Sequence, residues 1–125
     1  MSHAWVELEI PVLRENIRRV RAVLSSGTDL IFVVKSNAYG HGMLPVAEAA
    51  WGCGVRWFAV ADVDEGMILR AVLPQANLLV VGAADAADVP GALQGRLIVL
   101  LANASHAARL ADAAARAGGV LRCHV

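Results

Sequence analysis

The chain has few aromatic side chains, no long uninterrupted apolar run and no excess of charge of either sign. Aromatic residues make up 5% of its 125 residues although 58% are hydrophobic, so small aliphatic side chains supply most of its apolar character. No segment reaches the roughly 18 consecutive apolar residues that a membrane span needs. The 11 basic and 11 acidic side chains cancel and form no basic cluster of the kind that binds a nucleic-acid backbone. We therefore expect neither a membrane partner nor a nucleic-acid partner.

Cysteine and histidine are too sparse and too scattered to predict a metal site. Cys53 and Cys123 lie far apart without the spacing of zinc ligands, so we expect two small buried hydrophobic residues rather than a disulfide or a metal centre. The amino terminus lacks the basic start and the apolar stretch of a secretory signal. These absences predict a cytoplasmic protein that binds no metal.

Along most of the chain, short apolar runs alternate with amphipathic stretches, the pattern of β–α units around a parallel sheet that is buried on both faces. The expected strands cover residues 30–34, 57–61, 78–81, 97–101 and 120–125. The expected helices cover residues 12–24, 43–51, 64–73, 106–117 and a short stretch near 85–93. Residues 11–125 therefore predict an α/β domain of about five β–α units.

This repetition fits either an open doubly wound sheet or a closed eightfold barrel of the TIM (β/α)8 type. Such a barrel needs about 250 residues, so we expect part of one. The chain also ends inside the fifth expected strand with no helix after it, which indicates a partial chain. Residues 1–10 alternate in polarity and predict a half-exposed strand outside the barrel series, paired with something other than these units.

The stretch after the strand at 30–34 carries the residues that predict chemistry. Lys35 stands at the carboxyl end of a buried apolar strand, where the active sites of such folds lie. An amine at the edge of an apolar core loses hydration, which favours the neutral form that attacks an aldehyde to make a Schiff base. Tyr39 follows in a turn containing Gly40 and Gly42, close enough to aim its hydroxyl into the same cavity and contact a phosphate. The competing interpretation is a solvent-exposed lysine followed by turn residues, and spacing alone leaves both open.

Residues 34–42, Val-Lys-Ser-Asn-Ala-Tyr-Gly-His-Gly, resemble the pyridoxal-phosphate attachment motif of alanine racemases, a long and selective pattern. Flanking segments resemble the same family: Trp-Val-Glu-Leu-Glu at 5–9, Trp-Phe-Ala-Val-Ala at 57–61, and Asp-Glu-Gly at 64–66. The resemblance spans essentially the whole chain. Ser36 stands where alanine is commoner and Glu9 where aspartate is usual, and neither departure touches the lysine, the tyrosine or the glycines.

The resemblance implies a fold-type III enzyme, an eightfold barrel followed by a β domain, acting as a homodimer. It implies that Lys35 carries pyridoxal 5′-phosphate as a Schiff base and serves as one of two acid–base groups, while Tyr39 contacts the cofactor phosphate. The implied reaction interconverts L-alanine and D-alanine and supplies D-alanine for cell-wall peptidoglycan. The strand at 1–10 would pair with the β domain, and the opposing tyrosine would come from that domain of the partner subunit, so we expect these 125 residues alone to be inactive.

A non-catalytic carrier of pyridoxal phosphate, a racemase for another small amino acid such as serine, and an inert half-barrel scaffold are the alternatives. The carrier also needs a strand-end lysine, but the tyrosine–glycine–histidine–glycine turn resembles racemases more closely. Some polar neighbours receive structural assignments. Asp62, with Glu65 three positions later, predicts a helix cap, as do Asn103 and Ser105 before a later helix. His41 predicts a hydrogen-bonded turn residue.

Overall fold

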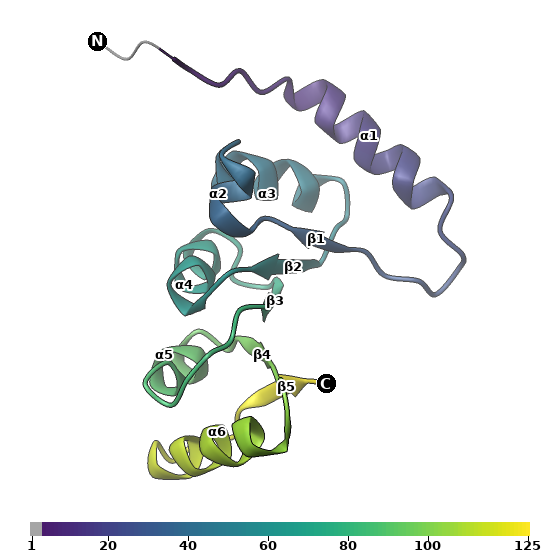
Figure 1. Cartoon of the computed structure of the whole chain (residues 1–125). Coiled ribbons are helices and arrows are strands. Elements are labelled where there is room, and N and C mark those ends of the chain that lie inside the picture. The colour runs from purple at the N-terminus through teal and green to yellow at the C-terminus, as the bar shows by residue number, and fades with distance from the viewer. Residues whose placement is uncertain (1–3) are drawn as a thin grey trace.

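The computed structural model describes residues 4–125 as an alternation of helices and strands (Figure 1). The strands are β1 Ile31–Val33, β2 Trp57–Val60, β3 Asn77–Val80, β4 Ile98–Leu100 and β5 Arg122–His124. The helices are α1 Ile10–Ala22, α2 Lys35–Tyr39, α3 Met43–Gly52, α4 Val63–Val72, α5 Val89–Gln94 and α6 Ala104–Arg116. Each strand and helix expected within 11–125 has a matching element, and α2 is the one that the sequence did not predict.

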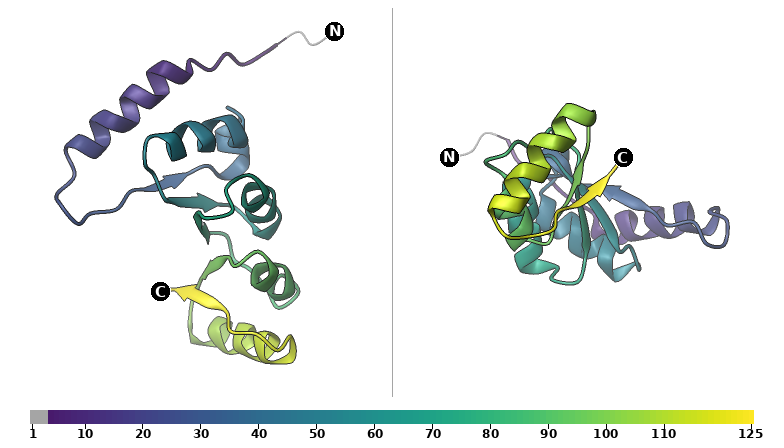
Figure 2. Two further views of the ribbon diagram at one scale, coloured as in Figure 1. Left: turned by 180° about the vertical axis from the view of Figure 1, so that it is seen from behind. Right: turned by 90° about the horizontal axis from the view of Figure 1, so that it is seen from below.

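The five strands form one parallel sheet in the order β1-β2-β3-β4-β5. Because crossovers between parallel strands share one hand, an order that never reverses puts every connecting helix on the same side of the sheet. Figures 1 and 2 show α3, α4, α5 and α6 along the outer side of the curved sheet. A doubly wound sheet reverses its order and carries helices on both faces. The expected part of a barrel is therefore confirmed, and the doubly wound alternative is not what forms.

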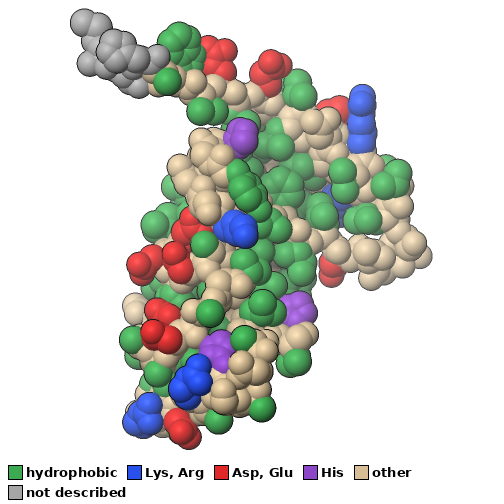
Figure 3. All heavy atoms as spheres, viewed as in Figure 1, with side chains coloured by type: hydrophobic (Ala, Val, Ile, Leu, Met, Phe, Trp, Pro, Cys, Tyr) green, Lys and Arg blue, Asp and Glu red, His purple; other side chains and the backbone are tan. Residues whose placement is uncertain are grey.

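The two faces of the sheet differ in burial. The face under the helices supplies the fully buried centre of the core, made by Val34, Phe58, Val60, Leu78, Val80, Leu97 and Val99. On the opposite face, Ile31 and Val33 at the β1 edge are 38% and 41% exposed, whereas Leu79 of β3 and Ile98 of β4 are buried. Hydrophobic side chains gather in the middle of the molecule, over β1 and β2 (Figure 3). This second face, opposite to the helices, is the one that a closed barrel turns inward.

The amino-terminal segment differs from the expectation. Residues 4–9 form no strand, and the chain enters α1 at Ile10, two residues before the expected start. Trp5 is 78% exposed, and Pro11 lies in the first turn of α1, where its missing N–H needs no partner. The strand expected over 1–10 is thus not formed by residues 4–9, and residues 1–3 lie outside the described part. Its pairing with a β domain stays a prediction.

Two expectations from composition can be compared with the structure. Among residues 4–125, no helix combines the length and the apolar composition that a bilayer crossing needs. Both cysteines are free, and Cys53 is half-buried beside α1. Cys123 is exposed, so the expectation of a buried residue there is wrong. The reason is its place on β5, the outermost strand in the sheet order, where neighbouring elements lie on one side only.

Arg70 of α4 ties together the segments that lead into β3 and β4. Its guanidinium donates to the carbonyl oxygens of Gly95 and Ala76, each at 2.7 Å. Burial, followed by repulsion from Arg96 and Arg122, lowers the pKa of Arg70. An arginine nevertheless stays charged in proteins, so backbone carbonyl oxygens replace water around it. This side chain fixes the end of the sheet opposite to the one where Lys35 lies.

Gly82→Ala tests the close approach of the chain after β2 to the chain after β3. The Gly82 N–H donates to the Ala61 carbonyl oxygen at 2.9 Å, and an added Cβ would lie 2.3 Å from that oxygen. We expect the free energy of unfolding in urea to fall by about 1–3 kcal/mol, because a backbone atom must move. Gly52→Ala is the control, because no described atom lies within 4 Å of its added Cβ. Its free energy of unfolding should stay the same or rise by up to about 1 kcal/mol, since alanine favours a helix over glycine. Equal stability of the two variants would contradict the close approach.

Candidate active site

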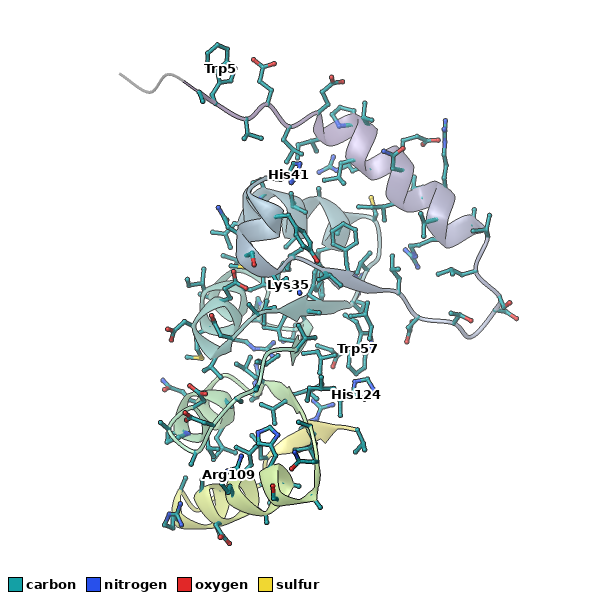
Figure 4. The ribbon with its side chains drawn as sticks, viewed as in Figure 1. Trp5, Lys35, His41, Trp57, Arg109 and His124 are labelled. Atoms are coloured by element: carbon teal, nitrogen blue, oxygen red, sulfur yellow. The ribbon has the colours of Figure 1, made fainter. Side chains whose placement is uncertain are left out.

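The carboxyl ends of the parallel strands lie along one rim of the sheet, and β1 delivers Lys35 there. Val34 is fully buried and its N–H donates to the Ala59 carbonyl oxygen at 2.8 Å, so the backbone is anchored up to the residue before Lys35. Lys35 itself is half-buried (Figure 4). Among residues 4–125, its ammonium has no ion-pair or hydrogen-bond partner. The structure thus presents an uncommitted primary amine at the rim.

The element labelled α2 is not a right-handed helix: the four residues after Lys35 form a single left-handed turn. Residues 36–39 have φ angles between 52° and 55°, and Gly40 follows at φ 88°. Each L-residue in this region costs roughly 1–2 kcal/mol, and such residues normally occur singly. Four consecutive non-glycine residues persist there only because surrounding interactions offset the cost. The sequence predicted a turn but not its hand, since none of residues 36–39 is a glycine.

Asn37 is the centre of the hydrogen bonds that hold this turn. Its side-chain Oδ1 accepts the N–H of Met43, the first residue of α3, at 2.8 Å. Its carbonyl oxygen accepts the N–H groups of Gly40 at 3.1 Å and Gly42 at 3.0 Å. Its own N–H donates to Oε1 of Glu65 at 2.9 Å. Asn37 therefore links the lysine turn to both α3 and α4.

The carboxylate of Glu65 connects two successive β–α loops. Oε1 accepts from the Asn37 N–H at 2.9 Å, and Oε2 accepts from the Ala61 N–H at 2.8 Å. The Glu65 N–H donates to Oδ1 of Asp62 at 2.9 Å, which confirms the predicted cap of α4. Glu65 does not close a capping box on the Asp62 amide, because its side chain reaches the neighbouring turn instead. An acid three residues after a cap was the available signal, but spacing cannot show which amide that acid will reach.

Tyr39 and His41 line a shallow hollow together with Leu8 and Phe32. Tyr39 is 60% exposed, and Nδ1 of His41 lies 2.9 Å from the Ala38 carbonyl oxygen, as expected for a hydrogen-bonded turn histidine. Lys35 does not line this hollow. A cavity shared by Lys35 and Tyr39 therefore stays a prediction, and this hollow is lined by Tyr39 alone of the two. What joins the two side chains is the left-handed turn, which begins after one and ends at the other.

The sequence profile of the alanine racemase N-terminal domain matches residues 9–125. The alanine racemase of Syntrophobacter fumaroxidans is 34% identical over 125 residues, covering 100% of this chain and 33% of that protein. A broad-specificity amino-acid racemase of Pseudomonas putida is 39% identical over 125 residues, covering 99% of this chain and 30% of that protein.

Solved structures give the same relationship. The crystal structure of alanine racemase from Bacillus anthracis with bound L-Ala-P superimposes with a TM-score of 0.84 at 28% identity, covering 97% of this chain and 31% of that chain. The chain spans about a third of the length of the curated relatives that it matches.

Ser36→Gly tests the left-handed geometry next to Lys35. Ser36 is exposed with φ 53°. Glycine removes a backbone cost of about 1–2 kcal/mol there, while part of the gain is lost to the entropy of the unfolded chain. We expect the free energy of unfolding in urea to rise by about 0.5–1 kcal/mol. Ser105→Gly, in the first turn of α6, should lower it by about 0.5–1 kcal/mol instead. If both variants lose stability equally, residues 36–39 are not left-handed in solution.

Proposed function

The chain belongs to the alanine racemase family through the N-terminal domain that its residues 9–125 match, and from this premise we propose that it is the first part of a pyridoxal-phosphate-dependent amino-acid racemase. The proposed reaction interconverts L-alanine and D-alanine, with Lys35 as the residue that carries the cofactor. One observation carries the proposal: the only lysine of the sequence stands at the strand rim, and its amine has no partner among residues 4–125.

The residues at the rim fit pyridoxal 5′-phosphate. Its aldehyde needs a primary amine, and Lys35 is the one side chain of this sequence that provides it, since the other basic residues are arginines and histidines. Gly40 and Gly42, at φ 88° and 94°, leave the backbone beside the turn without side chains, which allows a ligand to approach closely. When bound, the cofactor supplies an electron sink for the charge left on substrate Cα after proton loss.

Lys35 has two tasks in the proposed reaction. Its Nζ would hold the cofactor when the cofactor is bound, and as a free amine it would hold or return the proton of Cα on one face. Tyr39 has a binding task. Its hydroxyl makes no hydrogen bond within residues 4–125, so it is available to donate to the cofactor phosphate.

Racemisation also needs a second acid–base group on the opposite face of Cα. Tyr39 is the only tyrosine of the chain and is assigned to the phosphate. We therefore propose that the second group comes from the partner subunit of a homodimer, and that these 125 residues alone bind the cofactor without racemising alanine. A cytoplasmic location and the supply of D-alanine to peptidoglycan belong to the same proposal.

Conversion of L-alanine to D-alanine by the full-length protein, followed by chiral chromatography, separates a racemase from a carrier. A carrier binds pyridoxal phosphate and forms no D-alanine. The same assay with L-serine tests the competing substrate, which the similarity to a broad-specificity racemase from Pseudomonas putida keeps open.

Borohydride reduction of the chain with pyridoxal phosphate tests the attachment site. We expect one stable phosphopyridoxyl group, located at Lys35 by peptide mass spectrometry, because this side chain is the only lysine. Lys35→Arg is the matched control, since it keeps the positive charge and removes the primary amine. The proposal fails if the wild-type chain carries no adduct at position 35, or if Lys35→Arg is labelled to the same extent.

Tyr39→Phe tests the phosphate contact. Removing one hydrogen bond to a charged group costs roughly 1.5–3 kcal/mol, so we expect affinity for pyridoxal phosphate to fall by about tenfold or more. Pyridoxal without its phosphate is the control ligand, and its binding to both chains should be alike. Titration followed by imine absorbance gives both affinities. An equal loss for the two ligands would show that Tyr39 supports the fold rather than the phosphate.

A further inference from the structure

We infer that Glu65 is a positioning residue for the cofactor lysine, whose carboxylate holds the left-handed turn at 36–39 in place by accepting the N–H of Asn37 at 2.9 Å. The inference rests on the proposed attachment of the cofactor to Lys35. It adds a residue from the next β–α unit, which sequence analysis assigned to a helix cap alone.

The geometry of Glu65 is that of a bridge between two loops. One carboxylate oxygen accepts from Asn37, after β1, and the other accepts from Ala61, after β2, at 2.8 Å. Glu65 is half-buried, and its position is set by its own N–H, which donates to the capping carboxylate of Asp62. The bridge therefore runs from the start of α4 to the turn that follows Lys35.

The chemistry of a carboxylate suits this position. An ionised carboxylate only accepts hydrogen bonds and has two oxygens, so it can satisfy two N–H donors that arrive from different directions. Such bonds to a charged acceptor are stronger than bonds between neutral groups. A glutamine at position 65 offers a single acceptor and turns an NH2 group toward the second donor. An aspartate is one methylene shorter than the span between the two loops requires.

The effect on Lys35 passes through the turn. Lys35 lies two residues before Asn37, and Tyr39 lies two residues after it. Residues 36–39 occupy a conformation that is unfavourable for L-residues, so they relax when the interactions that hold them are removed. Relaxation would leave the amine and the hydroxyl without a fixed separation. A site that must be ordered as the cofactor binds has a lower affinity than one already ordered.

Hydrogen exchange of the cofactor-free chain tests the contact itself. In Glu65→Gln the single side-chain oxygen can serve only one of the two donors, so we expect the protection of the Asn37 amide or of the Ala61 amide to fall by about tenfold or more, the equivalent of one hydrogen bond. The amide of Val81, which bonds to Val60 in the sheet at 3.0 Å, should keep its protection. Asp64→Asn is the matched control: it removes a carboxylate from the same helical turn, and Asp64 makes no hydrogen bond to residues 36–39 in the described structure. Unchanged protection of both Asn37 and Ala61 in Glu65→Gln would overturn the inference.

Imine formation with pyridoxal phosphate tests the consequence for Lys35. We expect the apparent dissociation constant, followed by imine absorbance, to rise by about tenfold in Glu65→Gln and to stay within about twofold of wild type in Asp64→Asn. Glu65→Asp keeps the negative charge that favours the first turn of a helix, so it guards against simple failure to fold. It should weaken imine formation as Glu65→Gln does. Full imine formation by a folded Glu65→Asp or Glu65→Gln chain would overturn the positioning role.

The two experiments separate this inference from the proposed function. If the wild-type chain forms no imine, the proposed function fails, whereas the exchange of Asn37 still reports whether Glu65 holds the turn. If the wild-type chain forms the imine and the Glu65 variants form it equally well, the proposed function stands and the inference fails.

Discussion

Parallel pairing in an unbroken order is the constraint on which the rest of this structure depends. It places the carboxyl ends of all five strands on one rim and returns every connecting helix along one side. Burial follows from this: the helix-covered face, with Phe58 and Leu78, is fully buried, while the opposite face is exposed at its β1 edge, at Ile31 and Val33. The amine of Lys35 stands at the rim because β1 ends there. The residues that hydrogen-bond the turn after Lys35 come from adjacent β–α connections.

At the rim, hydrogen bonds offset the free-energy cost of an unfavourable backbone conformation. Residues 36–39 adopt a left-handed turn that costs roughly 1–2 kcal/mol for each residue. Hydrogen bonds of the Asn37 N–H, carbonyl oxygen and Oδ1 offset this cost, and the partner of the N–H is Glu65 in the next β–α unit. Two successive β–α units therefore contribute hydrogen bonds to the conformation beside Lys35.

Several features followed from the sequence with little ambiguity. Short apolar runs located the strands and helical periodicity located the helices, because each run of apolar residues ends at a glycine, a cap or a polar turn. The amino-terminal segment was the failure: alternation around Trp5 predicted a strand, but a strand also needs a neighbour with free backbone groups, and residues 4–9 have none beside them in the sheet. The prediction that Cys123 is buried was wrong for a related reason, since β5 has a neighbouring strand on one side only.

The sequence by itself determined the α/β alternation, the place of Lys35 at the carboxyl end of an apolar strand, and the motif that joins the chain to the alanine racemase family. These are local properties, carried by side-chain order along one segment. Only the tertiary structure decided between a barrel wall and a doubly wound sheet, the left hand of the turn after Lys35, and the partner of the Glu65 carboxylate. Each of those depends on contacts between different β–α units. A local sequence pattern does not show which groups of two units meet.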